Sequence, residues 1–387
     1  MKKLFFLVIV WSALLIGEAK KPRCQVRVLL EEKTDFNGNI WVIESPQGFL
    51  LTDPADPERT IELKDPRLTV ELLDAIVWIN GKKLLDDRVK IDAIDGHLKV
   101  NGLSYQGSLI VVIEPIDKKL FLVNKVDLED YVFSVVRWES WPGWPLEFNK
   151  AFAITCRTYV IHKIMAARQA KKKTAAQMLY DIKATNIHQT YKGVDAFDHI
   201  RQAVEETAGL IMTHKKKPIM AMYDACCGGI IPAHSVSIDF RDAPYLSRKY
   251  ACTTCKDFKI FNWSKSYDIE QFSKMLQKES KRVRALQDIK VSKKDKAGLV
   301  QEVRVKLGNT WTSLTGKKVY SLCKNIKSFC FSVNKQADKI IFEGKGFGHH
   351  MGLCQWGASR MVKDGADHRQ VLDFYYPGVT VMKVETI

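Results

Sequence analysis

One carboxylate near the middle of the chain stands among aromatic residues. Within residues 135–147, Glu139 is accompanied by three tryptophans and two prolines. A carboxyl group held against indole rings loses solvation, so its pKa rises and it can act as a general acid near neutral pH. Cleavage of a glycosidic bond requires such an acid. The pattern therefore indicates Glu139 as a catalytic acid, and Trp138, Trp141 and Trp144 as flat surfaces for sugar rings. The alternative is that the aromatic residues fill a junction between domains.

Other carboxylates lie close to Glu139 in the sequence. A glycosidase that uses water normally needs two carboxyl groups about 5 to 9.5 Å apart. Asp127, Glu129, Asp130 and Glu147 are the neighbours, but Glu129 and Asp130 also suit the solvated first turn of a helix. The sequence thus indicates one acid and no convincing pair.

The segment after the tryptophans has helical periodicity and carries two cationic candidates. Apolar residues recur at helical spacing over residues 145–169. Lys150 and Arg157 lie on this helix as candidates for substrate contacts. Arg157 falls inside an apolar run, so it is expected to be either a structural ion pair or a clamp for a ligand.

A glycine-rich segment near the C-terminus supplies further polar groups. Residues 344–352 resemble a phosphate-binding loop only superficially, because the βαβ context of a dinucleotide site is missing. Glycines at this density let a backbone approach a ligand closely, and His349 and Gln355 can offer hydrogen bonds. The adjacent pair His349 and His350 is poorly arranged to coordinate one metal ion.

Nine cysteines, an odd number, leave at least one thiol unpaired or bonded to another molecule. The tightest set is Cys226, Cys227, Cys252 and Cys255, in which one pair is vicinal. Four thiols can hold zinc, but zinc sites normally use two CxxC-like pairs. We therefore expect a disulfide from Cys226 or Cys227 to Cys252 or Cys255.

The elements that position these residues indicate an α+β fold. Short strands separated by Asn-Gly and Asp-Gly turns fill residues 24–126, which is typical of antiparallel sheets. Helices are expected at residues 128–137, 145–169, 199–208, 269–280, 355–364 and 368–374, with strands between them. We expect an antiparallel β-rich region at residues 20–126, then a mixed catalytic, glycan-binding domain at residues 127–387 with the long helix after Glu139.

The first residues indicate export. Two lysines precede an apolar run at residues 4–16, and small residues at positions 17 and 19 suit a cleavage site, which predicts a signal peptide at residues 1–19. An uncleaved signal acting as an inner-membrane anchor is the alternative. The expected location is therefore the periplasm or the cell envelope. The net charge of +16 favours a polyanionic neighbour, but export and scattered lysines argue against nucleic acid.

Thirteen short segments, taken in order along the chain, resemble one known family. They are residues 101–109, 123–124, 128–132, 135–145, 150–151, 157–159, 188–193, 203–209, 223–229, 346–349, 352, 355–358 and 375–378. This set is similar to the sporulation stage II protein D family of peptidoglycan lytic transglycosylases.

The resemblance places the family's catalytic glutamate at Glu139. It implies that the glycan groove is bordered by Lys150, Arg157, Gln189, Tyr191, Tyr223 and His349, to which the analysis above adds Trp138 and Gln355. Ser140 and Trp141 replace a frequent Met-Pro, so the groove is expected to differ in shape. Some relatives bind zinc through a loop equivalent to about residues 182–190, where only His188 remains here. We therefore expect no metal and no cofactor.

The activity implied by the resemblance cuts glycan without water and leaves 1,6-anhydro-N-acetylmuramic acid ends. Peptidoglycan strands stripped of peptide are the expected substrate, with an N-acetylmuramoyl-L-alanine amidase as functional partner. Because the nucleophile belongs to the substrate, one acid/base residue suffices. The alternative is a protein that binds glycan without cutting it and enhances a cell-wall amidase.

Overall fold

The computed structural model describes residues 24–384, except residues 34–40, 74–75, 84–86, 115, 117–118, 171–173, 175–177, 195–197, 233–237 and 278–285. The predicted signal peptide, residues 1–19, lies outside the described residues. Within the described part of the chain, no helix has both the length and the hydropathy that a membrane span requires.

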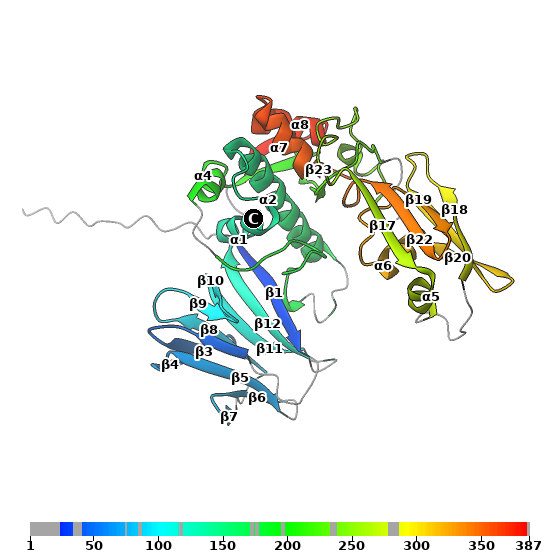
Figure 1. Cartoon of the computed structure of the whole chain (residues 1–387). Coiled ribbons are helices and arrows are strands. Elements are labelled where there is room, and N and C mark those ends of the chain that lie inside the picture. Colours follow the sequence, from blue (N-terminus) through cyan, green and yellow to red (C-terminus); the bar gives the residue numbers. More distant parts are fainter. Residues whose placement is uncertain are drawn as a thin grey trace, which may run out of the picture.

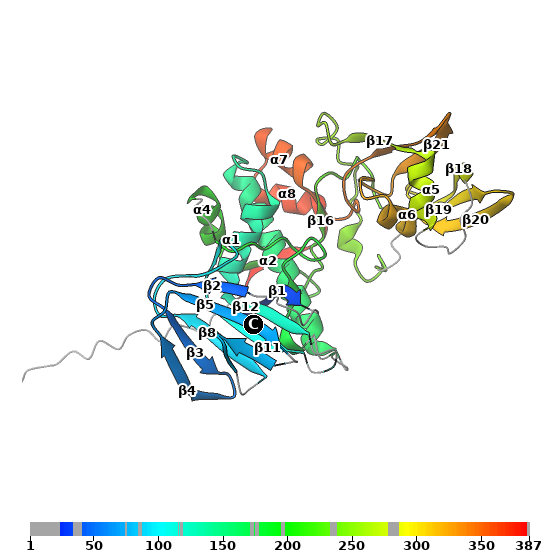
Figure 2. The same cartoon turned by 60° about the horizontal axis from the view of Figure 1, so that its bottom comes forward.

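The N-terminal part consists of two sheets (Figures 1 and 2). The larger described sheet has the order β13 (Ile182–Lys183), β1 (Gln25–Lys33), β12 (Leu120–Asp127), β11 (Ser108–Ile113), β8 (Arg88–Ala93), β3 (Phe49–Asp53) and β4 (Asp56–Leu63). The smaller has the order β10 (Leu103–Tyr105), β9 (Leu98–Val100), β2 (Trp41–Glu44), β5 (Arg67–Leu73), β6 (Ile76–Ile79) and β7 (Lys82–Lys83). Their buried side chains belong to one core, so the sheets pack face to face.

Local sequence explains these strands. Asn80 and Gly81 join β6 to β7 with φ angles of 48° and 73°, and such positive angles at both central residues belong to the tight turn that matches the twist of a hairpin. Asn101 and Gly102 do the same between β9 and β10, with φ angles of 48° and 81°. Pairing among these strands is antiparallel except between β1 and β13. The prediction of an antiparallel β-rich region is confirmed.

Two helices connect the sheets to the rest of the chain. Asp127 caps α1 (Leu128–Glu139) by accepting a hydrogen bond from the Glu129 N–H. The helix α2 (Leu146–Gln169) follows and is buried over most of its length. It contacts α1 and the C-terminal helices, so it lies at the centre of the molecule (Figure 1).

The remaining helices and strands complete the α+β architecture, as predicted. The helices are α4 (Asp198–Glu206), α5 (Ile269–Gln277), α6 (Gly316–Leu322), α7 (Gln355–Lys363) and α8 (His368–Tyr375), with a short 3-10 helix at Pro244–Leu246. The strands in this part of the chain are β14 (Leu210–His214), β15 (Lys217–Pro218), β16 (Tyr223–Asp224), β23 (Leu353–Cys354) and β24 (Thr380–Lys383). Of these, β14 and β15 contact α2, and β23 contacts α7 and α8. The two-residue strand β16 pairs in parallel with β23.

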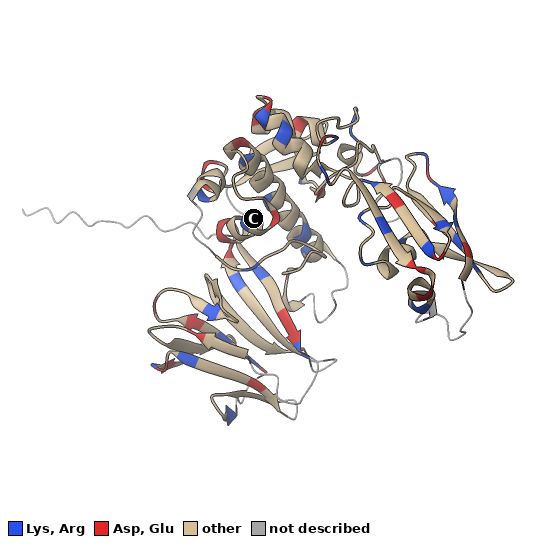
Figure 3. Ribbon diagram, viewed as in Figure 1, with Lys and Arg blue, Asp and Glu red and all other residues tan. Residues whose placement is uncertain are grey.

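A second hydrophobic core lies in residues 262–345, beside the helices in Figure 1. Two three-stranded sheets enclose it: β17 (Asn262–Asp268), β22 (Lys339–Lys345) and β21 (Phe331–Gln336), and then β18 (Leu286–Lys294), β19 (Val300–Leu307) and β20 (Thr310–Thr315). Helix α6 was not expected from the sequence. Lys and Arg are spread over both this unit and the rest of the chain, with Asp and Glu between them (Figure 3). The predicted boundary between a β-rich region that ends at residue 126 and a catalytic domain that begins at residue 127 stays a prediction.

Candidate functional site

A cleft of about 400 Å³ lies where the ends of several elements meet. Its walls come from the end of α1, the middle of α2, the loop after β13, strand β16, the loop after β22 and the start of α7. The lining residues are Glu139, Tyr159, Asn186, Ile187, His188, Met222, Tyr223, Asp224, Ala225, Phe347, Gly348, His349 and Gln355. A volume of this size is typical of a binding site for a small molecule or a few sugar units.

Glu139, the last residue of α1, places its carboxylate in this cleft. Its Oε1 accepts a hydrogen bond of 2.5 Å from the Thr190 N–H. Its main-chain carbonyl accepts one of 3.0 Å from Gln355 Nε2. Both contacts come from segments far away in the sequence, so the position of this carboxylate depends on the tertiary fold.

The tryptophans do not surround Glu139 as expected. None of the three lines the cleft. Trp141 is 59% exposed and Trp144 is buried against Phe148, and the rings of both contact Trp356. Trp138 lies beneath the ammonium group of Lys192, 4.7 Å from its ring centroid. The buried Trp144 fits the alternative interpretation, in which aromatic residues fill a junction. Trp138 lies outside the cleft, so its position does not support its assignment to the groove.

A hydrogen-bonded chain of Tyr131, Gln189 and Tyr223, and not the tryptophans, lies next to Glu139. The Tyr131 hydroxyl donates to Gln189 Oε1 at 3.0 Å, and Gln189 Nε2 donates to the Tyr223 hydroxyl at 3.4 Å. Gln189 is fully buried. Burial raises the pKa of Tyr223 well above its usual value, and the neighbouring Cys156 and Glu139 add to the rise. Tyr223 therefore stays a neutral hydroxyl at the cleft wall, and Gln189 positions it without lining the cleft.

Two histidines offer neutral imidazoles to the cleft. The Met351 N–H donates to His349 Nδ1 at 3.1 Å, which leaves the proton of the neutral ring on Nε2. Burial, with a smaller effect of His350, lowers the pKa of His349 to about 4. His188, which the sequence analysis mentioned only as a surviving metal ligand, also lines the cleft, and burial lowers its pKa.

Asp224 is a cleft residue that the sequence analysis missed. Burial raises its pKa to about 8, although its Oδ2 accepts a hydrogen bond of 2.6 Å from the His350 N–H. Gly348, with a φ angle of 131°, packs so closely that a Cβ there would lie 2.3 Å from the Cβ of Asp224. The glycine-rich segment thus approaches another part of the same chain closely. Asp224 lies in the segment 223–229 that carries part of the family resemblance, but neither the resemblance nor the residue pattern marked its carboxyl group as part of the site.

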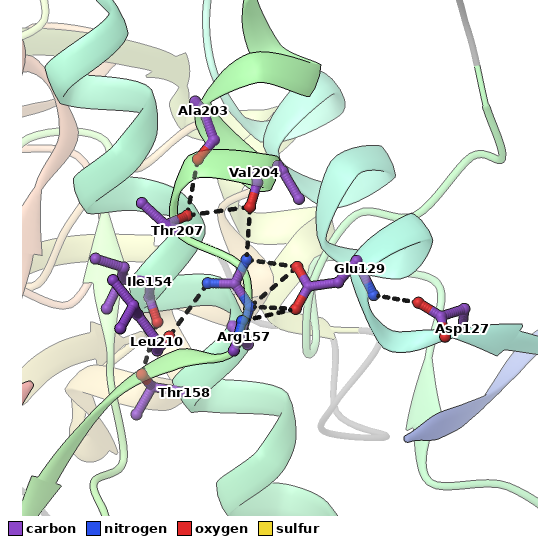
Figure 4. A network of polar contacts seen from close by, with 10 residues as sticks. Asp127, Glu129, Ile154, Arg157, Thr158, Ala203, Val204, Thr207 and Leu210 are labelled. Atoms are coloured by element: carbon purple, nitrogen blue, oxygen red, sulfur yellow. Dashed lines mark hydrogen bonds and ion pairs between the residues drawn. The ribbon is translucent and has the colours of Figure 1, made fainter. Parts of the chain in front are cut away.

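Arg157 is a structural residue and not a clamp for a ligand. Its side chain is fully buried, and its Nη2 lies 2.6 Å from Glu129 Oε2 while its Nε lies 2.9 Å from Oε1. The guanidinium also donates to the main-chain carbonyls of Leu210 and Val204 (Figure 4). The Arg157 side chain therefore joins α1 and α2 to α4 and to the first residue of β14. The prediction that Arg157 borders the groove is wrong because the side chain has no exposed surface.

Lys150 and Tyr191 also lie away from the cleft. Lys150 forms an ion pair of 2.7 Å with Glu147 within α2 and one of 2.6 Å with Glu206, which fastens α2 to α4. Tyr191 is buried, stacks on Tyr131, and donates its hydroxyl to Asn124 Oδ1 at 2.5 Å. Neither residue is among those that line the cleft. The predicted residues that the structure brings together there are Glu139, Tyr223, His349 and Gln355.

The expected disulfide among Cys226, Cys227, Cys252 and Cys255 is not formed. All nine cysteines lie in the described part of the chain as free thiols, and Cys227 Sγ lies 3.8 Å from Cys255 Sγ. A disulfide requires about 2.05 Å.

The buried side-chain amide of Gln189 gives a testable prediction. In Gln189→Met the hydroxyls of Tyr131 and Tyr223 lose their common partner, and a buried polar group left without one costs about 1–3 kcal/mol. We expect the free energy of unfolding, measured with urea, to fall by that amount. A variant of the exposed Gln202, Gln202→Met, is the control and should change stability by less than about 0.5 kcal/mol. An unchanged midpoint for Gln189→Met would contradict the network.

Comparison with known proteins identifies the family of the chain. The model of the stage II sporulation protein family matches residues 116–214, which contain α1, α2 and Glu139. A domain of unknown function matches residues 245–352. The chain belongs to the stage II sporulation protein D family, as the resemblance implied.

Three relatives illustrate the match. An uncharacterized protein of Brachyspira hyodysenteriae is 30% identical over 329 residues, which cover 84% of this chain and 82% of that protein. Stage II sporulation protein D of Bacillus amyloliquefaciens is 24% identical over 285 residues, covering 68% of this chain and 76% of the relative. An amidase enhancer of Bacillus subtilis is 24% identical over 285 residues, covering 62% of this chain and 38% of the relative.

Proposed function

We propose that this protein is a peptidoglycan lytic transglycosylase in which Glu139 is the acid and base. The observation that carries the proposal is the carboxylate of Glu139, which stands in a cleft lined by Tyr223, His349 and Gln355. The other carboxyl group in the cleft, Asp224, has a pKa raised to about 8 by burial, so it is mostly neutral at pH 7. An ionised second carboxylate, which a water-using glycosidase requires, is thus not supplied by Asp224.

The chemistry needs one proton donor that recovers its proton. Glu139 donates a proton to the oxygen that bridges C1 of N-acetylmuramic acid and the neighbouring N-acetylglucosamine, and the C1–O bond breaks. Positive charge develops at C1 and the ring oxygen, near the ionised carboxylate. The same carboxylate then takes the proton of the C6 hydroxyl as O6 bonds to C1. The products are a free sugar hydroxyl and a 1,6-anhydro end, and Glu139 is protonated again.

The residues around Glu139 suit these two proton transfers. The Thr190 N–H stabilises the ionised form of the carboxylate after the first transfer. Gln355 holds the carbonyl at the end of α1 and so fixes the direction of the side chain. Neutral His349 and the Tyr223 hydroxyl line the cleft as uncharged polar groups that do not compete for the transferred proton.

A second candidate function is a protein that binds glycan without cutting it and enhances an amidase. The observation that favours it is the relative named amidase enhancer. Incubation of the purified protein with glycan strands, followed by mass analysis for 1,6-anhydro ends, separates the two functions. Anhydro ends support the lytic activity, and bound but intact strands support the enhancer. In either case we propose that the protein is exported and acts in the cell envelope.

The proposed substrate is glycan stripped of stem peptides. A peptide on the lactyl group would obstruct sugars that must lie on both sides of Glu139 in a cleft of about 400 Å³. We expect anhydro ends to form much faster from peptide-free strands and from amidase-treated sacculi than from intact sacculi. An N-acetylmuramoyl-L-alanine amidase would then act before this protein. Equal rates on all three substrates would remove both the preference and the need for the amidase.

A further inference from the structure

Four buried cysteines gather on the side of β16 and β23 that the proposed function does not use. The thiols of Cys227, Cys252, Cys255 and Cys354 lie within 4.8 Å of one another. They come from three segments: the loop after β16, the loop before β17 and the end of β23. Such convergence of soft donors in the interior is typical of a structural metal site.

The spacing of the sulfur atoms fits zinc. Zinc–sulfur bonds of about 2.3 Å in a tetrahedron place neighbouring sulfurs about 3.8 Å apart. Cys227 Sγ and Cys255 Sγ are 3.8 Å apart. We propose that Cys227, Cys252, Cys255 and Cys354 bind one zinc ion as a closed tetrathiolate site.

Polar groups around the sulfurs are arranged as partners of thiolates. Cys354 Sγ accepts hydrogen bonds from the N–H groups of Cys227 at 3.3 Å and Gly357 at 3.4 Å. The hydroxyls of Tyr375 and Thr254 lie 3.2 and 3.4 Å from Cys252 Sγ. Donors of this kind orient metal-bound thiolates and spread their negative charge.

Two further features support the site. A Cβ on Gly357 would lie 2.6 Å from Cys252 Sγ and 3.1 Å from Cys354 Sγ, so only glycine leaves room for both sulfurs. The buried Arg248 lies over the ring of Tyr375 at 5.6 Å, and its Nε has no hydrogen-bond partner among the described residues. Its positive charge offsets part of the net negative charge of a zinc ion with four thiolates.

Cys226 is a fifth cysteine that lies next to the proposed zinc site. Its thiol lies beside Cys255 and Cys354 but is not one of the four that are mutually close. Two disulfides and one zinc ion would each use four of these five thiols, and the mutual closeness of all four sulfurs of Cys227, Cys252, Cys255 and Cys354 favours the zinc ion. Cys226 is therefore the matched control for the four proposed ligands.

The site would hold the cleft wall and the second core in a fixed relation. Cys354 precedes Gln355, which bonds the Glu139 carbonyl, and Cys227 follows Asp224 by three residues. Cys252 and Cys255 lie just before β17, where the chain enters residues 262–345. One ion would thus cross-link the base of that unit to the wall of the cleft.

The test measures zinc in the full chain, purified without chelator or reductant. We expect one zinc ion per chain by elemental analysis, and a cobalt-substituted protein with the intense visible absorption of a tetrahedral sulfur site. Cys354→Ser and Cys252→Ser should lower bound zinc at least tenfold, while Cys226→Ser keeps it.

Two outcomes would overturn the proposal. One is protein without zinc whose mass, under non-reducing conditions, shows disulfides among these cysteines. The other is zinc that persists in Cys354→Ser. Glu139→Gln should bind zinc as the native chain does, so failure of the zinc site and failure of the proposed catalytic role can be told apart.

Discussion

Replacement of Glu139 by glutamine is expected to reduce the formation of 1,6-anhydro ends by at least about 10²- to 10⁴-fold, the contribution typical of a general acid or base. The amide has nearly the shape of the carboxylate, and its oxygen can still accept the Thr190 N–H. It cannot donate a proton to the bridging oxygen or take one from the C6 hydroxyl. The loss should therefore fall on the rate of cutting, with glycan binding and the melting temperature nearly unchanged.

The control for this variant is Glu205→Gln, an identical change on an exposed part of α4 that does not line the cleft. It should keep full activity. If Glu139→Gln stays within a few-fold of the native rate, Glu139 is not the acid. If neither the native protein nor Glu205→Gln cuts glycan but both bind it, the enhancer function is supported instead.

Removal of the buried guanidinium in Arg157→Met is expected to lower the free energy of unfolding by about 3–5 kcal/mol, as when one partner of a buried ion pair is lost. Glu129 and the carbonyls of Leu210 and Val204 would lose their donor together. Because no surface of Arg157 reaches the cleft, the effect should appear in urea unfolding and not as a selective loss of glycan affinity in the folded fraction.

Arg360→Met provides the matched control. Arg360 also pairs with an aspartate, Asp364, at 2.9 Å, but both side chains are about half exposed. An exposed pair contributes less than about 1 kcal/mol. An Arg157→Met protein with native stability and weakened glycan binding would restore the ligand-clamp interpretation.

Local features of the sequence predicted the secondary structure well. The Asn-Gly pairs at 80–81 and 101–102 lie in hairpin turns, and the helix expected at residues 145–169 is α2 (Leu146–Gln169). These signals act over a few residues, because backbone conformation and helical periodicity are local properties. Helix α6 (Gly316–Leu322), by contrast, is two turns long and has too few apolar positions to show a period.

The site was predicted only in part, because it depends on contacts between distant segments. Glu139, Tyr223, His349 and Gln355 meet in the cleft, as the sequence analysis and the resemblance together implied. Arg157 and Lys150, which were also predicted to border the groove, lie outside the cleft. The sequence could not reveal this, because it does not show whether the partner of a charged side chain is a ligand or a carboxylate of the same chain. The order of the cysteines likewise suggested Cys226 as a member of the thiol cluster, whereas the parallel pairing of β16 with β23 brings in Cys354.

The unit formed by residues 262–345 leaves and rejoins the chain at one point. Asn262 pairs with Lys345 across β17 and β22, and the Gly346 N–H donates to the Phe261 carbonyl at 2.7 Å. Because residues 262–345 fold around their own core, the two ends of this unit are already held together. Inserting the unit therefore costs the rest of the protein little more loop-closure entropy than a tight turn would. A segment attached in this way can be gained, lost or exchanged during evolution without shifting the register of β16 and β23, which place Tyr223 and, at the start of α7, Gln355 beside Glu139.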